Sequence, residues 1–135
     1  MIPERHEIEA IVDSSIRSAL KRDLGPITPE TSMIKDLGVD SLELVEIVYE
    51  VEEELDIEIA AEELFPQRLL RDPANVQDGA ITETGVERLR EQFAFTTLPD
   101  VAPGTSVADI TATLSTVRTF TDYVEKVVRK SRGEA

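Results

Sequence analysis

The sequence predicts an all-α protein, a helical bundle interrupted by one insertion. Apolar residues recur with the 3.6-residue period of a helix in several separate segments. Proline, glycine and helix-capping residues bound these segments. The chain has 135 residues, enough for one domain but not for two ordinary ones. We therefore expect residues 1–135 to form a single domain.

The first helix is expected near the N-terminus, where Pro3 suits the start of a helix and Gly25-Pro26 would stop it. Its apolar face is formed by Ile8, Ile11, Val12, Ser15, Ile16, Ala19 and Leu20. A long loop follows through residues 26–39. Four apolar residues of this loop are expected to pin it against the core: Ile27, Met33, Ile34 and Leu37.

The second helix is expected over about 41–55. Asp40 stands where an N-cap belongs and Glu43 follows three residues later, which predicts a capping box. The apolar face consists of Leu44, Ile47, Val48, Val51 and Leu55. Ile57 and Ile59 are expected in the core, and a short helix from Glu62 to Phe65 would end at Pro66.

An insertion spans about residues 66–114. Its four prolines and three glycines exclude one long helix. Ile81, Thr82 and Val86 fit a hydrophobic staple around an N-cap, so residues 83–93 are expected to be helical despite Gly85. Ser106 with Asp109 predicts a second helix start, before Val107, Ile110 and Leu114. We expect the segment to be ordered and to fold back onto the bundle. It either covers a cleft or adds a docking surface, or it only enlarges the core.

The stretch Asp-Leu-Gly-Val-Asp-Ser-Leu-Glu, residues 36–43, delivers Ser41 to the first turn of the acidic second helix. Free N–H groups and the positive end of the helix dipole favour a phosphate on such a residue. Gly38 permits a turn and a close approach, and Asp36 and Asp40 suit a modifying enzyme with a metal or a basic surface. A serine at a helix start is otherwise usually only a cap or a solvated first-turn residue.

The run from Asp36 to Ile59 closely resembles the prosthetic-group site and second helix of acyl carrier proteins, whose Asp-Ser-Leu serine carries 4′-phosphopantetheine. The similarity extends back through residues 27–32 to the first helix, and residues 116–124 are similar to the family's last helix. The resemblance implies a four-helix bundle with its core at about 4–65 and 115–130. The segment 66–114 would be an extra helical insertion between the second and last major helices.

The resemblance further implies a carrier that is the substrate of other enzymes and not itself an enzyme. A phosphopantetheinyl transferase would move 4′-phosphopantetheine from coenzyme A to Ser41, at a site completed by Asp40, Gly38 and Leu42. The arm would hold acyl groups as thioesters for enzymes of fatty acid, polyketide or specialised lipid synthesis. These partners would be ketosynthases, acyltransferases or acyl carrier protein ligases with basic docking patches.

By motif position, docking would use Leu42, Glu43, Val45, Glu46, Tyr49, Glu52 and Glu53. Leu42, Val45 and Tyr49 form a second apolar stripe, which either contacts a partner or completes the core; we expect partner contact for Leu42 and Tyr49. If the bundle sequesters its cargo, the acyl chain would lie among Val48, Val51, Ile57, Ile59, Phe120 and Val124.

Charge supports protein partners. The net charge is −14, which argues against nucleic acid or an anionic membrane as the main partner. Residues 36–63 contain twelve acidic side chains and no lysine, arginine or histidine, whereas the C-terminal helix is basic on balance. Such a surface attracts basic patches and weakens with salt. The alternative is that these glutamates only solvate an exposed helix.

The composition argues against several kinds of site and against a membrane-spanning helix. The chain has no cysteine, so thiolate metal sites and disulfides are excluded, and we predict no metal site. His6 is the only histidine and is expected on the surface of the first helix. No apolar run reaches about 18 residues, so we expect a cytoplasmic protein without membrane insertion. A monomer is the default for a small, highly charged carrier.

Three other interpretations are open. A peptidyl or aminoacyl carrier would use the same serine, although Gly38-Val39-Asp40 and the glutamate-rich helix are typical of the acyl type. An unmodified acidic helical adaptor protein would not need Ser41. A calcium loop at residues 36–43 is disfavoured, because its acids do not follow the EF-hand spacing.

Overall fold

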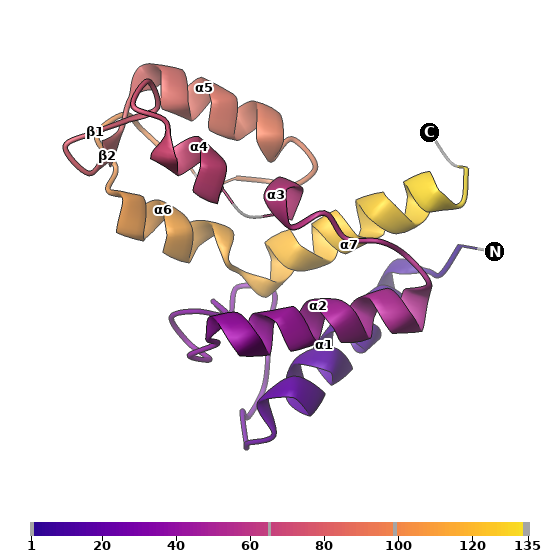
Figure 1. Ribbon diagram of the computed structural model, residues 1–135. Helices are drawn as coiled ribbons and strands as arrows, with labels where there is room; N and C mark the ends of the chain where they lie inside the picture. The colour runs from indigo at the N-terminus through magenta and orange to yellow at the C-terminus, as the bar shows by residue number, and fades with distance from the viewer. Residues whose placement is uncertain (1, 65, 99, 134–135) are drawn as a thin grey trace.

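The computed structural model describes residues 2–64, 66–98 and 100–133. It confirms a mostly helical fold in two groups (Figure 1), with α1, α2 and α7 together and α4, α5, α6 and a small hairpin beside one end of α7. The elements are α1 (Arg5–Leu20), α2 (Ser41–Leu55), α3 (Ala61–Leu64), α4 (Gln67–Arg71), β1 (Val76–Gln77), β2 (Ala80–Ile81), α5 (Glu83–Gln92), α6 (Val107–Leu114) and α7 (Val117–Ser131). No helix in the described part of the chain is both long and apolar enough to cross a membrane.

The first group is the expected four-helix bundle. Helices α1, α2 and α7 bury their apolar faces against one another, and α3 adds Leu64 to the same core. Tyr123 of α7 is fully buried, and its hydroxyl accepts the Ala60 N–H at 3.2 Å, which fastens the segment before α3. The core consists of Ile8, Val12, Ile16, Ala19, Leu20, Met33, Val39, Ile47, Val51, Leu55, Ile57, Leu64, Phe120, Tyr123, Val124 and Val128.

Two details of the first helix and its loop differ from the prediction. Helix α1 ends at Leu20 rather than at Gly25-Pro26, because Lys21 adopts a left-handed conformation and donates its N–H to the Arg17 carbonyl. Ile34 does not pin the loop, since 45% of its surface is exposed. The anchoring apolar side chains are Ile27, Met33, Leu37 and Val39.

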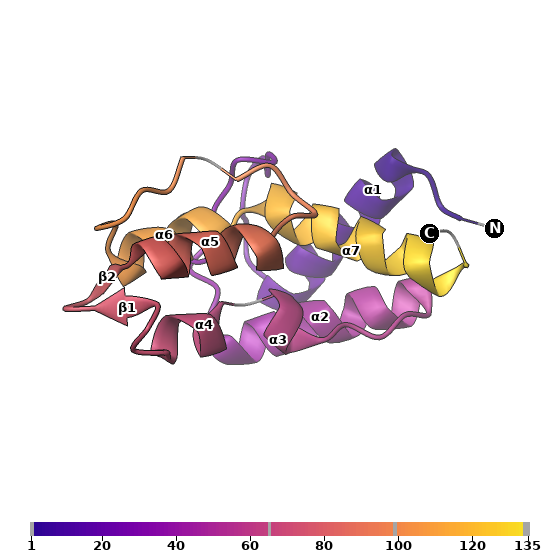
Figure 2. The ribbon, with the colours of Figure 1, turned by 90° about the horizontal axis from the view of Figure 1, so that it is seen from above.

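The insertion is ordered, but it builds a second core instead of mainly extending the first. Figure 2, seen from above, shows α5 over α6 in this second group. Both helices are amphipathic, and each buries its apolar face against the apolar face of the other. Helix α5 begins at the expected cap, Thr82, and α6 at the expected cap, Ser106. The second core contains Ile81, Val86, Leu89, Phe93, Val101, Ile110 and Leu114.

Phe95 joins the two cores. Its ring lies 5.6 Å from the ring of Phe93 in the insertion and 5.4 Å from that of Tyr123 in the bundle, edge to face. The Lys126 ammonium lies 5.4 Å from the same ring centre. The next residue, Thr96, donates its hydroxyl proton to Asp122 at 2.6 Å. These contacts dock the insertion against α7 and give the two groups one relative position.

The β1–β2 hairpin was not expected from the sequence analysis. Its two-residue turn is Asp78-Gly79, in which both residues have positive φ. Behind the hairpin the backbone packs tightly, and a Cβ on Gly85 would overlap the Asn75 carbonyl oxygen and lie 2.6 Å from Ile81. Asn75 is buried and donates its side-chain N–H to the Leu69 carbonyl at 3.0 Å. Gly85 is therefore required by packing, although it weakens the intrinsic propensity of α5.

Gly85→Ala is expected to destabilise the protein by about 1–3 kcal/mol, because the added methyl group overpacks the contact between α5 and the Asn75 backbone. Chemical denaturation followed by circular dichroism measures the change. The control is Thr84→Ala, at the neighbouring exposed position of the same helix. A Gly85→Ala variant that is more stable than the parent, as helix propensity alone would give, contradicts this packing account.

Candidate functional site

Ser41 is the first residue of α2 and its side chain is exposed. The predicted capping box is present on either side of it. The Glu43 N–H donates to Asp40 Oδ1 at 2.8 Å, and the Asp40 N–H donates to Glu43 Oε1 at 3.1 Å. These reciprocal bonds fix the first turn, so the Ser41 hydroxyl has a defined position at the helix N-terminus.

Arg22, which the sequence analysis did not single out, binds the same turn from the end of α1. Its guanidinium donates to Glu43 Oε2 at 3.0 Å and to the Leu37 carbonyl at 2.6 Å. Gly38 follows with φ of +65°, as its predicted role in the turn requires. Arg22 thus connects the helix that precedes the loop with the helix that follows it. One exposed arginine in a charged chain gives no sequence signal for such a contact.

The loop before Ser41 is also bonded to the C-terminal part of the chain. The Met33 N–H donates to the Ser115 carbonyl at 2.9 Å, and the Val117 N–H donates to the Thr31 carbonyl at 2.9 Å. The hydroxyl groups of Ser32 and Ser115 lie 3.1 Å apart. Residues 31–33 and the junction of α6 with α7 are therefore held side by side, although 83 positions separate the two serines.

The first turn of α2 suits a phosphodiester. The backbone N–H groups of Ser41 and Leu42 lie in the first turn, where no earlier helical residue offers a carbonyl acceptor. They can therefore donate to phosphate oxygens. Within the described residues, no side chain forms a hydrogen bond with the Ser41 hydroxyl that would make it a nucleophile.

All three residues of the apolar stripe predicted on α2 are exposed. Leu42 is 77% exposed, Val45 66% and Tyr49 60%. Val45, for which the sequence left core packing open, therefore belongs to the surface. A hydrogen bond to Glu53, together with the charge of its carboxylate, raises the pKa of Tyr49 above the ordinary tyrosine value. Exposed apolar residues that follow each other along one helix are typical of an interaction surface.

The four glutamates of the predicted docking set fall into two kinds. Glu46 and Glu53 are exposed. Glu43 is occupied by the capping box and Arg22, and Glu52 accepts the Ile59 N–H at 2.8 Å. The last two carboxylates stabilise the fold around α2, so they have less freedom to bind a basic partner.

The residues predicted to line an acyl chain lie in the bundle core or at its edge. Val51, Ile57, Phe120 and Val124 are buried, whereas Val48 and Ile59 are partly buried at its edge. A surface groove of about 520 Å³ runs between residues 56–63 and the C-terminal half of α7, and it reaches Ile57. Another, of about 410 Å³, lies between α1, residues 27–29 and α7. Neither groove is lined by Ser41.

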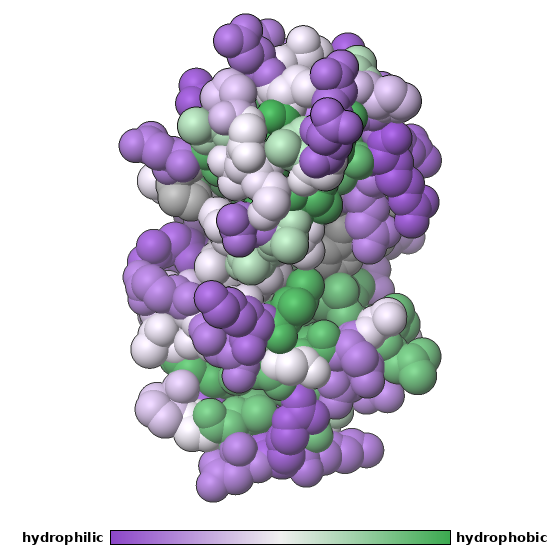
Figure 3. Space-filling model, turned by 90° about the vertical axis from the view of Figure 1, so that its left-hand side faces the viewer, coloured by the Kyte–Doolittle hydropathy of each residue, from purple (hydrophilic) through white to green (hydrophobic). Residues whose placement is uncertain are grey.

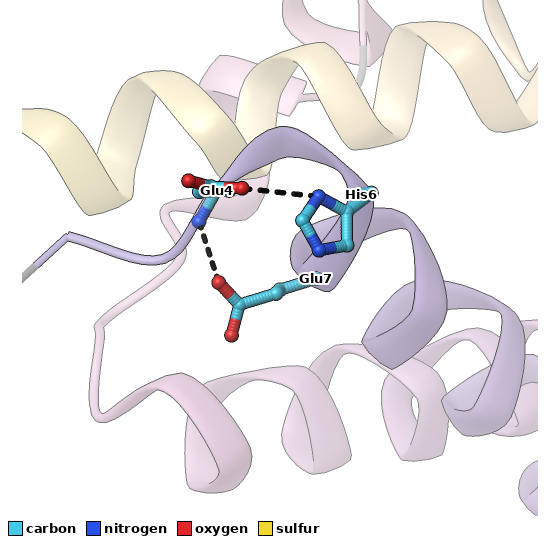
Figure 4. Close-up of side chains that lie close together, drawn as sticks. All are labelled: Glu4, His6 and Glu7. Carbon is cyan, nitrogen blue, oxygen red and sulfur yellow. Dashed lines mark hydrogen bonds and ion pairs between the residues drawn. The ribbon is translucent and has the colours of Figure 1, made fainter.

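His6 lies on the surface of α1, as predicted. Figure 4 shows it beside Glu4 and Glu7, with His6 Nδ1 3.3 Å from a Glu4 carboxylate oxygen. All three side chains are exposed. Glu7 lies there because it accepts the Glu4 N–H at 3.0 Å at the start of α1. Helix capping therefore accounts for the cluster.

Comparison with known proteins bears on the same segment. Residues 10–72 match the family model described as the phosphopantetheine attachment site. An acyl carrier protein of Syntrophus aciditrophicus (strain SB) is 40% identical over 72 residues, 53% of this chain and 84% of that protein. An acyl carrier protein of Helicobacter pylori (strain J99 / ATCC 700824) is 40% identical over 52 residues, 38% of this chain and 67% of that protein. No solved structure matches the chain significantly.

Asp40→Ala is expected to lower the free energy of unfolding by about 0.5–2 kcal/mol, because the Glu43 N–H loses its acceptor at the start of α2. Thermal and chemical unfolding measure the loss. Asp40→Asn keeps a capping oxygen and serves as the control. If the alanine and asparagine variants unfold alike, the cap does not fix this turn.

Proposed function

The chain belongs to the acyl carrier protein family, and we propose that it bears its 4′-phosphopantetheine group on Ser41. Members of this family are carriers that other enzymes modify and use; this chain is accordingly a carrier protein and not an enzyme. The prosthetic group supplies a terminal thiol, which a chain without cysteine lacks. That thiol holds an acyl group as a thioester.

The position of Ser41 is the observation that carries the assignment. It is exposed, it begins a capped helix, and it lies inside the segment that matches the attachment-site family. Transfer joins the Ser41 oxygen to the β-phosphorus of coenzyme A, breaks the pyrophosphate bond and releases adenosine 3′,5′-bisphosphate. A base of the transferase accepts the proton of the Ser41 hydroxyl. Asp40, Gly38 and Leu42 complete the attachment site by capping the helix, shaping the turn and offering an apolar contact.

The cargo that fits best is an acyl intermediate of fatty acid, polyketide or specialised lipid synthesis. Both relatives described above are named acyl carrier proteins. Besides the transferase, the partners would be ketosynthases, acyltransferases or acyl carrier protein ligases. We place the protein in the cytoplasm as a monomer that moves between these enzymes. A peptidyl or aminoacyl cargo is the alternative, and identification of the bound thioester decides between them.

The proposed docking surface consists of the stripe Leu42, Val45 and Tyr49 with the exposed carboxylates of Glu46 and Glu53. The apolar side chains would be buried against a partner, while the carboxylates would steer its basic patch toward Ser41. Glu43 and Glu52 would act mainly through the fold of α2, because both already accept hydrogen bonds from the backbone.

Incubation with coenzyme A, magnesium and a broad-specificity phosphopantetheinyl transferase is expected to add one phosphopantetheine unit to the protein. Intact-protein mass spectrometry measures the gain. Ser41→Ala should gain nothing, and its circular dichroism spectrum should match that of the parent because the side chain is exposed. A folded parent that remains unmodified by its cognate transferase, or an alanine variant that is still modified, contradicts the assignment.

Reversal of charge on the docking surface is expected to slow loading. Glu46→Lys and Glu53→Lys should each lower kcat/KM of the transferase by about threefold to tenfold at low salt, with a smaller effect at high salt. Glu58→Lys makes the same charge change at an exposed position outside α2 and is the control. An equal loss in all three variants would show that net charge matters and this surface does not.

A further inference from the structure

The end of the insertion is bonded to the loop that presents Ser41. Ser115 directly follows α6, and two of its groups contact this loop. Its carbonyl accepts the Met33 N–H at 2.9 Å, and its hydroxyl lies 3.1 Å from that of Ser32. Ser32 is buried and Ser115 is partly buried.

The neighbouring bonds determine which serine is the donor. Ser115 Oγ donates its single proton to the Ala112 carbonyl in the last turn of α6, at 3.0 Å. The Ser32 hydroxyl must then donate to Ser115 Oγ, since each hydroxyl has only one proton. Ser32 Oγ in turn accepts the Lys35 N–H at 3.0 Å. A directed chain of hydrogen bonds therefore runs from the loop into α6, and each bond polarises the next.

From Ser32 the connection continues to the residue before the cap of α2. The Ser32 carbonyl accepts the N–H groups of Asp36 at 2.9 Å and Leu37 at 3.2 Å. The Met33 carbonyl accepts the Val39 N–H at 2.9 Å, and the Val39 side chain is buried in the bundle core. Asp40, the N-cap, follows directly. Residues 32–39 thus form one bonded unit with the insertion at one end and Ser41 at the other.

Figure 3 views the molecule from the left-hand side of Figure 1. The insertion lies above the bundle, and the outline of the molecule narrows between the two. The contacts between Ser115 and residues 32–33 bridge the two parts, as do those of Phe95 and Thr96 with α7. The insertion is therefore held at two places, after α5 and after α6.

We propose that Ser32 and Ser115 are positioning residues for the transfer of phosphopantetheine to Ser41, and that the insertion braces the attachment loop through them. This role rests on the proposed modification of Ser41. The hydroxyl pair keeps the loop in the conformation that the transferase binds. When only a fraction of the molecules has that conformation, the apparent affinity falls by that fraction. Loss of the pair therefore raises KM and leaves kcat unchanged.

The test compares three serine substitutions in the full chain. Ser115→Ala removes the acceptor of the Ser32 hydroxyl, Ser115→Thr keeps a hydroxyl there, and Ser106→Ala removes the cap at the opposite end of α6. Amide hydrogen exchange is measured on the unmodified proteins, at the bonded N–H groups of Asp36, Leu37 and Val39. Loading by the transferase is then measured as KM and kcat.

Ser115→Ala is expected to speed exchange at the three loop amides by about threefold to tenfold, the equivalent of one net hydrogen bond, and to raise KM by up to the same factor. Ser115→Thr should restore both values. Ser106→Ala should speed exchange within α6 and leave the loop and KM unchanged. Unchanged loop amides and KM in Ser115→Ala, an equal effect of Ser106→Ala, or no restoration by threonine would each overturn the proposal.

Failure of the proposed function has a different signature. A parent protein that gains no phosphopantetheine contradicts modification of Ser41 and the positioning role together. The exchange rates, which need no modification, then show separately whether the hydroxyl pair still braces the loop.

Discussion

The reciprocal hydrogen bonds between Asp40 and Glu43 decide where α2 begins, and the position of Ser41 depends on them. The bonds leave Ser41 in the first turn, with free N–H groups beside it and its hydroxyl in solvent. Arg22 binds Glu43 and the Leu37 carbonyl, so the same turn is also tied to α1. A cap worth about 1 kcal/mol is thereby built into the tertiary structure. The site can be rigid although it lies on the surface.

The insertion packs mainly on itself. Its helices α5 and α6 bury their apolar faces against each other, so the bundle keeps the core formed by α1, α2, α3 and α7. Phe95 packs between the two cores and fixes the insertion against α7. Ser115 then returns the chain to the bundle beside the loop that leads to Ser41. The insertion is therefore a second packed unit, and Ser115, which directly follows it, contacts the loop before Ser41.

The sequence was sufficient for the features that have local causes. Helix α2, its capping box and the caps Thr82 and Ser106 depend on residues three or four positions apart, and all were predicted. The β1–β2 hairpin also has a local signal, the Asp78-Gly79 pair of its turn, which the sequence analysis did not use. Contacts between distant segments had none: the pairing of Ser32 with Ser115 and the reach of Arg22 depend on how the helices pack. For the same reason the mutual burial of α5 and α6 could not be told from packing onto the bundle.

Peptide-level mass spectrometry would show directly whether Ser41 carries the phosphopantetheine group. Trypsin cleavage after Lys35 and Arg68 releases residues 36–68, in which Ser41 is the only serine and threonine is absent. In protein produced together with a phosphopantetheinyl transferase, we expect one phosphopantetheine unit on this peptide and none on any other. A phosphopantetheine unit on a different peptide would contradict this expectation. So would an unmodified 36–68 peptide from folded protein when a known carrier produced in the same cells is fully loaded.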